Sequence, residues 1–306
     1  LSAGAVAHEA GTREMDHLGG LIKRMPWTAF GFLVGAAAIS ALPPLNGFVS
    51  EFLIFLGAFG AAAVSGPRVA VPCLAAIAGL ALIGGLAVAC FTKAFGIVFL
   101  GEPRSERAGR AHEAGWAMRL PMLVLAAGCA AVGLGAPWLL PALSPVVGCA
   151  GADAGLAALA RGSSALLPLT AVAAALLAAA VLLAVLRSWL LRGRALGETV
   201  TWDCGYSRPS ARMQYTASSF AQPLTKLFSA LLRTRRRLAQ PAGFFPSSAD
   251  FATATPDLAR SRLFGPAYAA IERTLSKLRW AQHGHLQLYV LQLALVLLVL
   301  LLWKSA

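Results

Sequence analysis

The chain has 306 residues, of which 58% are hydrophobic and only 13% are charged. A soluble globular domain carries about twice that charged fraction, so the composition excludes an ordinary soluble protein. The net charge of +13 does not indicate nucleic-acid binding, because the Lys and Arg residues lie in polar segments between long apolar runs. Several of these runs reach the ~20 residues that a membrane-spanning helix needs. We therefore expect an all-α, polytopic transmembrane helical bundle.

The first residues, 1–7, form a short apolar stretch with no Met and no basic segment before it. This pattern is not typical of a signal peptide. We interpret it as the end of a spanning helix and expect the chain to be the C-terminal part of a longer protein. His8 follows at the start of a polar loop, where histidine would relay protons because it titrates near neutrality. An interfacial histidine without that role is the alternative.

The next apolar region, residues 27–64, is interrupted by Pro43, Pro44 and Gly47. Two adjacent prolines cannot lie inside an unbroken helix, because each lacks an N–H and its ring crowds the preceding turn. Gly47 adds a point at which the backbone turns freely. The two apolar pieces are each short for a full crossing, so we expect one discontinuous helix, with a re-entrant pair as the alternative. Such irregular backbone at membrane depth is buried in protein or lines a wet cavity.

Glu51 follows the break and is the only ionisable residue between Arg24 and Arg68. A charged carboxylate at bilayer depth is costly and is usually retained for a function. We predict that Glu51 carries protons or ions. The alternative is a structural role at the start of the second half-helix, where the helix dipole favours a negative charge.

The second predicted span, about residues 71–100, contains Lys93. This lysine either extends its aliphatic stem to let the ammonium reach the membrane interface or is buried and loads and releases a proton. Third and fourth spans are predicted at about residues 120–140 and 166–190. The last span, residues 286–303, is almost entirely Leu and Val, and we expect it to be a terminal anchor helix.

Residues 192–283 are polar and basic, and two amphipathic helices are predicted inside this segment. Such helices lie along a membrane surface or a neighbouring subunit rather than cross the bilayer. The chain therefore divides into a transmembrane bundle (1–190), a basic segment with lateral helices (191–283) and a terminal helix (284–306). Apolar residues at helical spacing define the two lateral helices: Phe220, Leu224, Leu227, Phe228, Leu231 and Leu232 in one, and Phe264, Tyr268, Ile271, Leu275 and Leu278 in the other.

The distribution of basic residues predicts an orientation. If the broken helix is one crossing, only Arg68, Arg161 and Lys304 fall on one side of the membrane. Lys93 lies inside a span, and all other Lys and Arg residues fall on the opposite side. By the positive-inside rule the richer side is cytoplasmic, so we expect a multi-pass protein of the cell inner membrane with its C-terminus outside.

The cysteines give no sign of a metal or redox centre. The five cysteines include no CxxC pair and mostly lie in apolar spans, where free cysteine behaves as a small hydrophobic residue. Asp203 and Cys204 have no partners at metal-ligand spacing, so we interpret them as structural. We expect no metal, no cofactor and no redox centre. His17, His112, His283 and His285 are expected to be loop residues.

Two segments resemble a known family. Residues 8–21, which begin His8-Glu9-Ala10-Gly11, together with Met25-Pro26 and residues 42–52, resemble the proton-conducting antiporter-like subunits. This family is shared by respiratory complex I, Mrp antiporters and group 4 membrane-bound hydrogenases. Residues 201–206 and 212–220 narrow the resemblance to the large membrane subunits of the formate hydrogenlyase and hydrogenase-4 type.

The resemblance implies roles for individual residues. Glu51 matches the charged position of the second broken helix of the family, Lys93 matches the lysine of the following helix, and His8 matches the histidine before the cytoplasmic loop. Glu9 departs from the family, which usually has a small residue there. The first inverted repeat of the family has no counterpart in this chain.

The resemblance also implies a function. It indicates a proton-translocating membrane subunit of a hydrogenase-, formate hydrogenlyase- or NADH dehydrogenase-like redox complex. Other membrane subunits, soluble hydrogenase or dehydrogenase subunits and the lipid bilayer would be its partners. One alternative is an Mrp-type cation/proton antiporter subunit, with Na⁺ as well as H⁺ as a candidate ion. The other is a purely structural membrane anchor.

Overall fold

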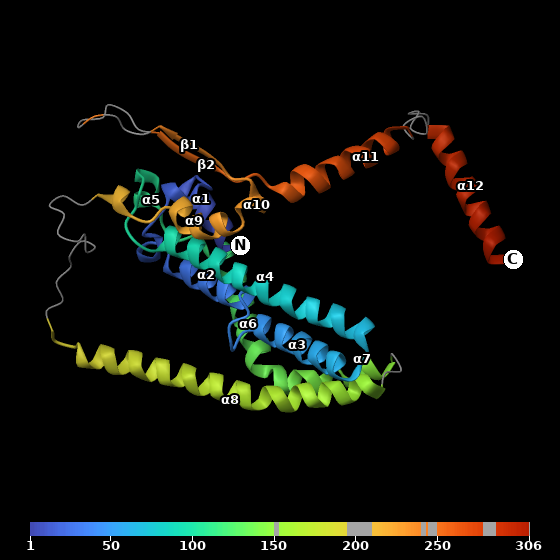
Figure 1. Cartoon of the computed structure of the whole chain (residues 1–306), viewed down its shortest axis with the longest axis horizontal. Helices are drawn as coiled ribbons and strands as arrows, with labels where there is room; N and C mark the ends of the chain where they lie inside the picture. The colour runs from blue at the N-terminus through green and yellow to red at the C-terminus, as the bar shows by residue number, and fades with distance from the viewer. Residues whose placement is uncertain (150–152, 195–209, 240–242, 244–249, 278–285, 306) are drawn as a thin grey trace. The chain divides into compact units, whose positions relative to one another are not determined.

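The computed structural model describes residues 1–149, 153–194, 210–239, 243, 250–277 and 286–305. The chain divides into two compact units, Leu1–Ala221 and Gln222–Ala306. The described residues are mainly helical, and five of their helices are long and apolar enough to cross a membrane (Figure 1). The predicted all-α polytopic bundle is confirmed.

The first unit contains six helices of the bundle and several short helices that connect them. The bundle helices are α1 (Ser2–Ala10), α2 (Pro26–Ile39), α3 (Asn46–Val64), α4 (Pro67–Phe99), α6 (Trp116–Ala142) and α8 (Asp153–Leu190). The short helices are η1 (Met15–His17), η2 (Leu21–Lys23), α5 (Glu106–Arg110), α7 (Ser144–Cys149) and η3 (Ala211–Met213). Helix α9 (Ala217–Leu227) crosses the boundary between the two units.

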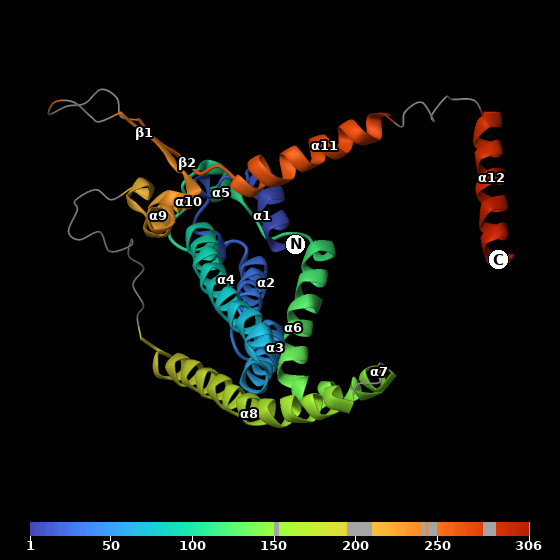
Figure 2. The same ribbon diagram turned by 45° about the vertical axis from the view of Figure 1, so that its right-hand side comes forward.

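The predicted break is present between α2 and α3, although α3 by itself is long and apolar enough to cross a membrane. Helix α2 has 14 residues and α3 has 19, and they follow one another along the 33-residue α4 (Figures 1 and 2). A helix of that length extends about 50 Å, so α2 and α3 together match one long neighbour. The break contains the cis peptide bond between Pro43 and Pro44 and a left-handed residue, Ala41, with φ of 52°.

Two glycines allow the break to pack closely, and this changes the reason expected for Gly47. Gly47 lies in the first turn of α3, where a Cβ atom would overlap the carbonyl oxygen of Ala38. Its role is close approach to α2 rather than free rotation of the backbone. Gly133 of α6 meets the break from the other side, where a Cβ atom would overlap the carbonyl oxygen of Pro44 and lie 2.7 Å from Cα of Leu45.

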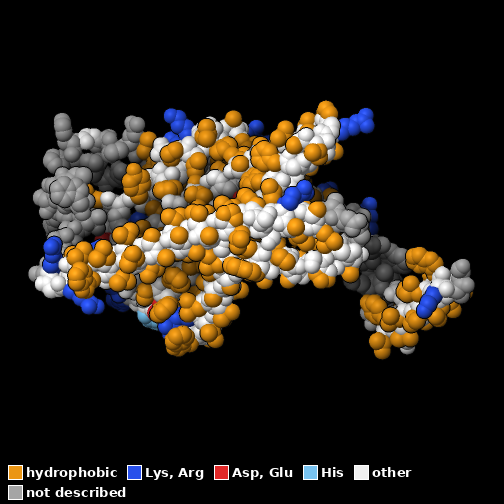
Figure 3. All heavy atoms as spheres, turned by 90° about the horizontal axis from the view of Figure 1, so that it is seen from below, with side chains coloured by type: hydrophobic (Ala, Val, Ile, Leu, Met, Phe, Trp, Pro, Cys, Tyr) orange, Lys and Arg blue, Asp and Glu red, His pale blue; other side chains and the backbone are white. Residues whose placement is uncertain are grey.

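Most of the buried apolar residues that the structure describes fall into two clusters. One lies where α1, α2 and α4 meet the loops and includes Leu21, Met25 and Phe99, none of them more than 1% exposed. The other joins α3, α6 and α8 through Val49 and Leu166. Elsewhere apolar side chains cover the outer faces of the helices (Figure 3), as expected for surfaces that face lipid.

Helix α8 begins earlier than predicted. The loop expected before the fourth span, with Arg161 in it, is instead helical from Asp153 onward. Gly162 belongs to this early part of α8. It lies directly against Leu53 of α3, where a Cβ atom would be 2.8 Å from Cδ2. This small residue therefore serves helix packing.

The second unit contains the rest of the basic segment and the terminal helix. Its elements are α10 (Ser229–Leu232), β1 (Arg235–Ala239), β2 (Asp250–Ala254), the π-helical η4 (Ala259–Phe264), α11 (Gly265–Ser276) and α12 (Leu286–Ser305). The predicted lateral helices correspond to α9 with α10 and to η4 with α11; Leu278 lies outside the described residues. The antiparallel pairing of β1 with β2, in which Arg236 faces Thr253, was not predicted. The arginine run at the start of β1 is typical of a solvated charged segment. Its strand conformation depends on pairing with β2, which the local sequence does not predict.

Candidate functional site

Glu51 lies on α3 and points at α4. Its Oε2 atom is 3.7 Å from the position that a Cβ atom would take on Gly84 of α4. The absence of a side chain at Gly84 therefore lets the carboxylate approach the neighbouring helix. Glu51 lies beyond the first turn of α3, which contains no acidic residue. This position does not favour the structural alternative, in which Glu51 would serve the N-terminus of the half-helix.

Lys93 lies on α4, nine residues after Gly84. This spacing is two and a half helical turns, about 13 Å along the axis and on the opposite side of the helix. The aromatic contacts agree: Phe91 of α4 packs on Phe32 of α2 with ring centroids 6.4 Å apart, and Lys93, two residues further, faces away. The structure therefore does not bring Glu51 and Lys93 together.

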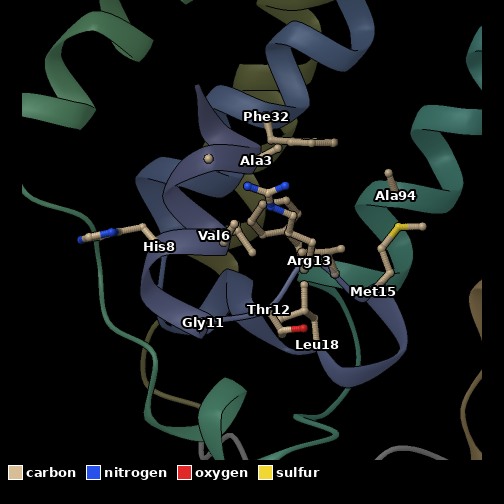
Figure 4. A pocket seen from close by; sticks show the side chains of 14 residues that line it. Ala3, Val6, His8, Gly11, Thr12, Arg13, Met15, Leu18, Phe32 and Ala94 are labelled. Atoms are coloured by element: carbon tan, nitrogen blue, oxygen red, sulfur yellow. The ribbon is translucent and has the colours of Figure 1, made fainter.

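His8 lies in the last turn of α1 and lines a cavity of about 850 Å³. The cavity is mostly apolar, and α2 contributes Phe32 while α4 contributes Ala94 and Val98. Arg13 extends its guanidinium towards Ala3 and Phe32, whereas the imidazole of His8 points away from this guanidinium (Figure 4). On α4, the first residue that lines the cavity is Ala94, which directly follows Lys93.

Helix α4 connects the three predicted site residues. Glu51 meets it at Gly84, Lys93 belongs to it, and the cavity of His8 begins at Ala94. From Gly84 to Ala94 the helix rises about 15 Å. No hydrogen bond spans such a distance, so proton movement between these groups requires intervening water.

Asn46 is a polar residue of the break that the sequence analysis did not single out. It is the first residue of α3, and its Oδ1 atom is buried without a hydrogen-bond partner among the described residues. Buried acceptors in proteins are nearly always satisfied. A bound water donating to Oδ1 would satisfy this one, next to Pro43 and Pro44.

Two acidic residues with distant partners were also missed. Glu113 accepts hydrogen bonds from the N–H of Trp27 at 2.8 Å and from the hydroxyl of Thr28 at 2.6 Å. Glu9, whose side chain is 11% exposed, lies 3.1 Å from Nδ1 of His112 and forms an ion pair when that histidine is protonated. These contacts join residues 85 to 103 positions apart in the sequence, so no local pattern reveals them.

The remaining histidines and cysteines do not form a metal site in the part of the chain that the structure describes. No group of three or more His, Cys, Asp or Glu side chains lies close enough there to hold an ion. His112 is exposed in a loop, as expected. His17, also expected in a loop, is instead the last residue of the short helix η1, and its Nδ1 atom lies 3.6 Å from Oε2 of Glu14. Cys204, His283 and His285 lie outside the described residues.

Comparison with known proteins shows which proteins this chain resembles. Residues 1–72 match the transmembrane family described as NADH:quinone oxidoreductase/Mrp antiporter. Hydrogenase-4 component B of Escherichia coli K12 is 35% identical over 98% of this chain and 46% of its own length. Formate hydrogenlyase subunit 3 of the same organism is 36% identical over 80% of this chain and 39% of its own length. The chain is similar to antiporter-like membrane subunits over most of its length.

Other antiporter-like subunits match more narrowly. A probable K⁺/H⁺ antiporter protein of Rhizobium meliloti is 35% identical over 44% of this chain and 13% of its own length. The chain spans less than half the length of the two Escherichia coli relatives. The predicted resemblance to antiporter-like subunits of the hydrogenase-4 type is confirmed, although residues 201–206, which narrowed it, lie outside the described residues. Together with the apolar helices, these matches establish a multi-pass membrane protein.

Proposed function

We propose that this chain translocates protons as part of a membrane subunit of a hydrogenase-4- or formate hydrogenlyase-type redox complex. One observation carries the proposal: Glu51, Lys93 and the cavity of His8 follow one another along α4, beside a broken helix. Ionisable groups inside a membrane bundle mark ion pathways, and broken helices at membrane depth accompany ion coupling.

The spacing of the three groups defines what each would do. Glu51 exchanges a proton with water at the helix break, where Asn46 offers a free acceptor. Lys93 passes a proton between this region and the cavity end of α4. His8, in the last turn of α1, exchanges it with the polar loops beyond. Each transfer runs through water, because the groups are too far apart for direct contact.

The proposed surroundings follow from the family and from the charge distribution. Electron transfer in soluble hydrogenase or dehydrogenase partners would drive the charge changes, and other membrane subunits would complete the path. The protein would lie in the cell inner membrane with the basic segment in the cytoplasm and the C-terminus outside, because basic loops stay on the cytoplasmic side.

A second candidate function is cation/proton antiport of the Mrp type. It is favoured by the family match of residues 1–72 and by the similarity to a probable K⁺/H⁺ antiporter protein. In that case Na⁺ or K⁺ would travel against protons, and proton movement would depend on the cation rather than on electron flow. The much wider match to hydrogenase-4 component B favours the redox-driven function.

The experiment that tests the proposal replaces Glu51 by Gln in the complex that contains this chain. Proton uptake into reconstituted vesicles is measured and divided by electron flux. Glu51→Gln is expected to abolish most of the uptake while electron flux continues, since the amide cannot carry a proton. Glu106→Gln is the control, because Glu106 is exposed and its ion-pair partner among the described residues is Arg110 of its own helix. Normal uptake in Glu51→Gln would show that the chain is a structural anchor, and a requirement for Na⁺ or K⁺ would favour antiport.

A further inference from the structure

A basic pocket of about 320 Å³ lies in the second unit, between β1 and the helices α9 and α10. Four polar residues line one side of it at helical spacing along α9 and α10: Gln222, Thr225, Lys226 and Ser229. Arg233 and Arg236 close the other side. The proposed proton path uses none of these residues.

The chemistry of the pocket is that of an anion site. Three basic side chains line it, those of Lys226, Arg233 and Arg236, and no acidic residue does. None of the three forms an ion pair with any residue that the structure describes. Lysine and arginine only donate hydrogen bonds, and the guanidinium fork matches two oxygens of a phosphate or carboxylate.

The backbone brings these cations together at a cost. Arg233 ends α10 in the left-handed conformation, with φ of 49°, and its N–H bonds to the carbonyl of Ser229 at 3.2 Å. Glycine usually occupies that position, because other residues are strained there. The turn sends β1 back past the helix. Since side chains alternate along a strand, Arg236 reaches the pocket while Arg235 and Arg237 lie on the other face.

We propose that this pocket binds the phosphate group of an anionic ligand. Phosphate offers several acceptor oxygens and matches a site with three cations and additional hydroxyl groups. Two sources share this chemistry. The apolar side of the same helices, with Leu224, Leu227 and Leu231, suits a helix at the membrane surface, where phospholipid head groups lie. The pocket itself lies on the opposite side of the helix, away from such a surface, and this position favours a water-soluble phosphate.

The test uses the full chain purified in neutral detergent. Inorganic phosphate binding is measured by equilibrium dialysis, and lipid retention is measured by native mass spectrometry after exposure to phosphatidylglycerol or phosphatidylcholine. Arg236→Gln removes one pocket cation, and Arg235→Gln makes the same change one residue away on the other face of the strand. Arg233→Gly removes the second guanidinium while suiting the left-handed backbone, so the fold is retained.

The expected result is a loss of at least about tenfold in affinity for Arg236→Gln and for Arg233→Gly, because each removes charge-assisted hydrogen bonds. Arg235→Gln should bind as the unchanged chain does. Binding of inorganic phosphate would identify a soluble source, and selective retention of phosphatidylglycerol would identify a lipid head group. The proposal is overturned if the unchanged chain binds neither probe, or if Arg235→Gln loses as much affinity as Arg236→Gln. Equal losses would indicate general attraction to a basic surface.

Discussion

The carboxylate of Glu113 accepts a 2.6 Å hydrogen bond from the hydroxyl of Thr28, which is fully buried at the start of α2. The same carboxylate accepts the N–H of Trp27 at 2.8 Å, so it satisfies a free donor of the first helical turn. A negative charge at this end of a helix is also favoured by the helix dipole. The loop before α6 thereby holds one end of the broken helix.

Replacing Glu113 by Ala should destabilise the protein. The Thr28 hydroxyl and the Trp27 N–H would lose their acceptor, and a buried polar group without a partner costs about 1–3 kcal/mol. The midpoint of thermal unfolding in detergent should fall clearly below that of the unchanged protein. Glu106→Ala is the matched control, because its exposed pair with Arg110 is worth at most ~1 kcal/mol. Equal melting of the two variants would show that Glu113 does not hold α2.

Gly133 should not tolerate a side chain. A methyl group there would overlap the carbonyl oxygen of Pro44, which belongs to backbone and cannot swing aside. Overpacking of this kind costs about 1–3 kcal/mol or more. Gly133→Ala should therefore lower the yield of folded protein and its unfolding midpoint. Gly128→Ala, on the same helix with open space around it, should be neutral or stabilising, because alanine favours helix by up to ~1 kcal/mol. Similar behaviour of both variants would contradict the close contact at the break.

The discontinuous helix should make a single crossing. Helix α2 alone is about 21 Å long, too short for a hydrocarbon core of about 30 Å. Topology reporters fused after Arg24 and after Gly66 should therefore report opposite sides of the membrane. Both on one side would mean that α2 and α3 enter and leave as a re-entrant pair. Reporters after Arg237 and after Ala306 should likewise differ, with Arg237 cytoplasmic, because α12 lies between them.

Glu51 and Lys93 should act in series, without direct contact. No ion pair joins them in the described structure, and they lie on opposite sides of α4. Glu51→Gln and Lys93→Ala should each block proton uptake in the complex that contains this chain, and the double variant should be no worse than either alone. Subunit levels should stay near normal. Proton uptake normalised to electron flux is the measurement. Fully additive partial losses would instead indicate two separate paths, because independent sites add.

The sequence alone was enough to recognise the membrane class, the spans and the break. A bilayer demands that each crossing segment satisfy its own backbone hydrogen bonds and present apolar side chains. About 20 consecutive residues meet that demand, so a crossing segment can be recognised as a continuous apolar stretch of the sequence. Pro43 and Pro44 interrupt such a run by their own covalent structure, whatever packs around them. Glu51 could also be recognised from the sequence, because it is the only ionisable residue between Arg24 and Arg68.

Only the tertiary structure decided which side chains meet. Thr28 and Glu113 are distant in sequence, and Gly133 contacts Pro44 only because α6 crosses the break. Similarly, Arg236 joins Lys226 in a pocket because a left-handed turn and a partner strand bring them together. Such contacts depend on helix crossing and strand pairing between separate segments. Those depend on the combined shape of many side chains, which no single stretch of the sequence contains.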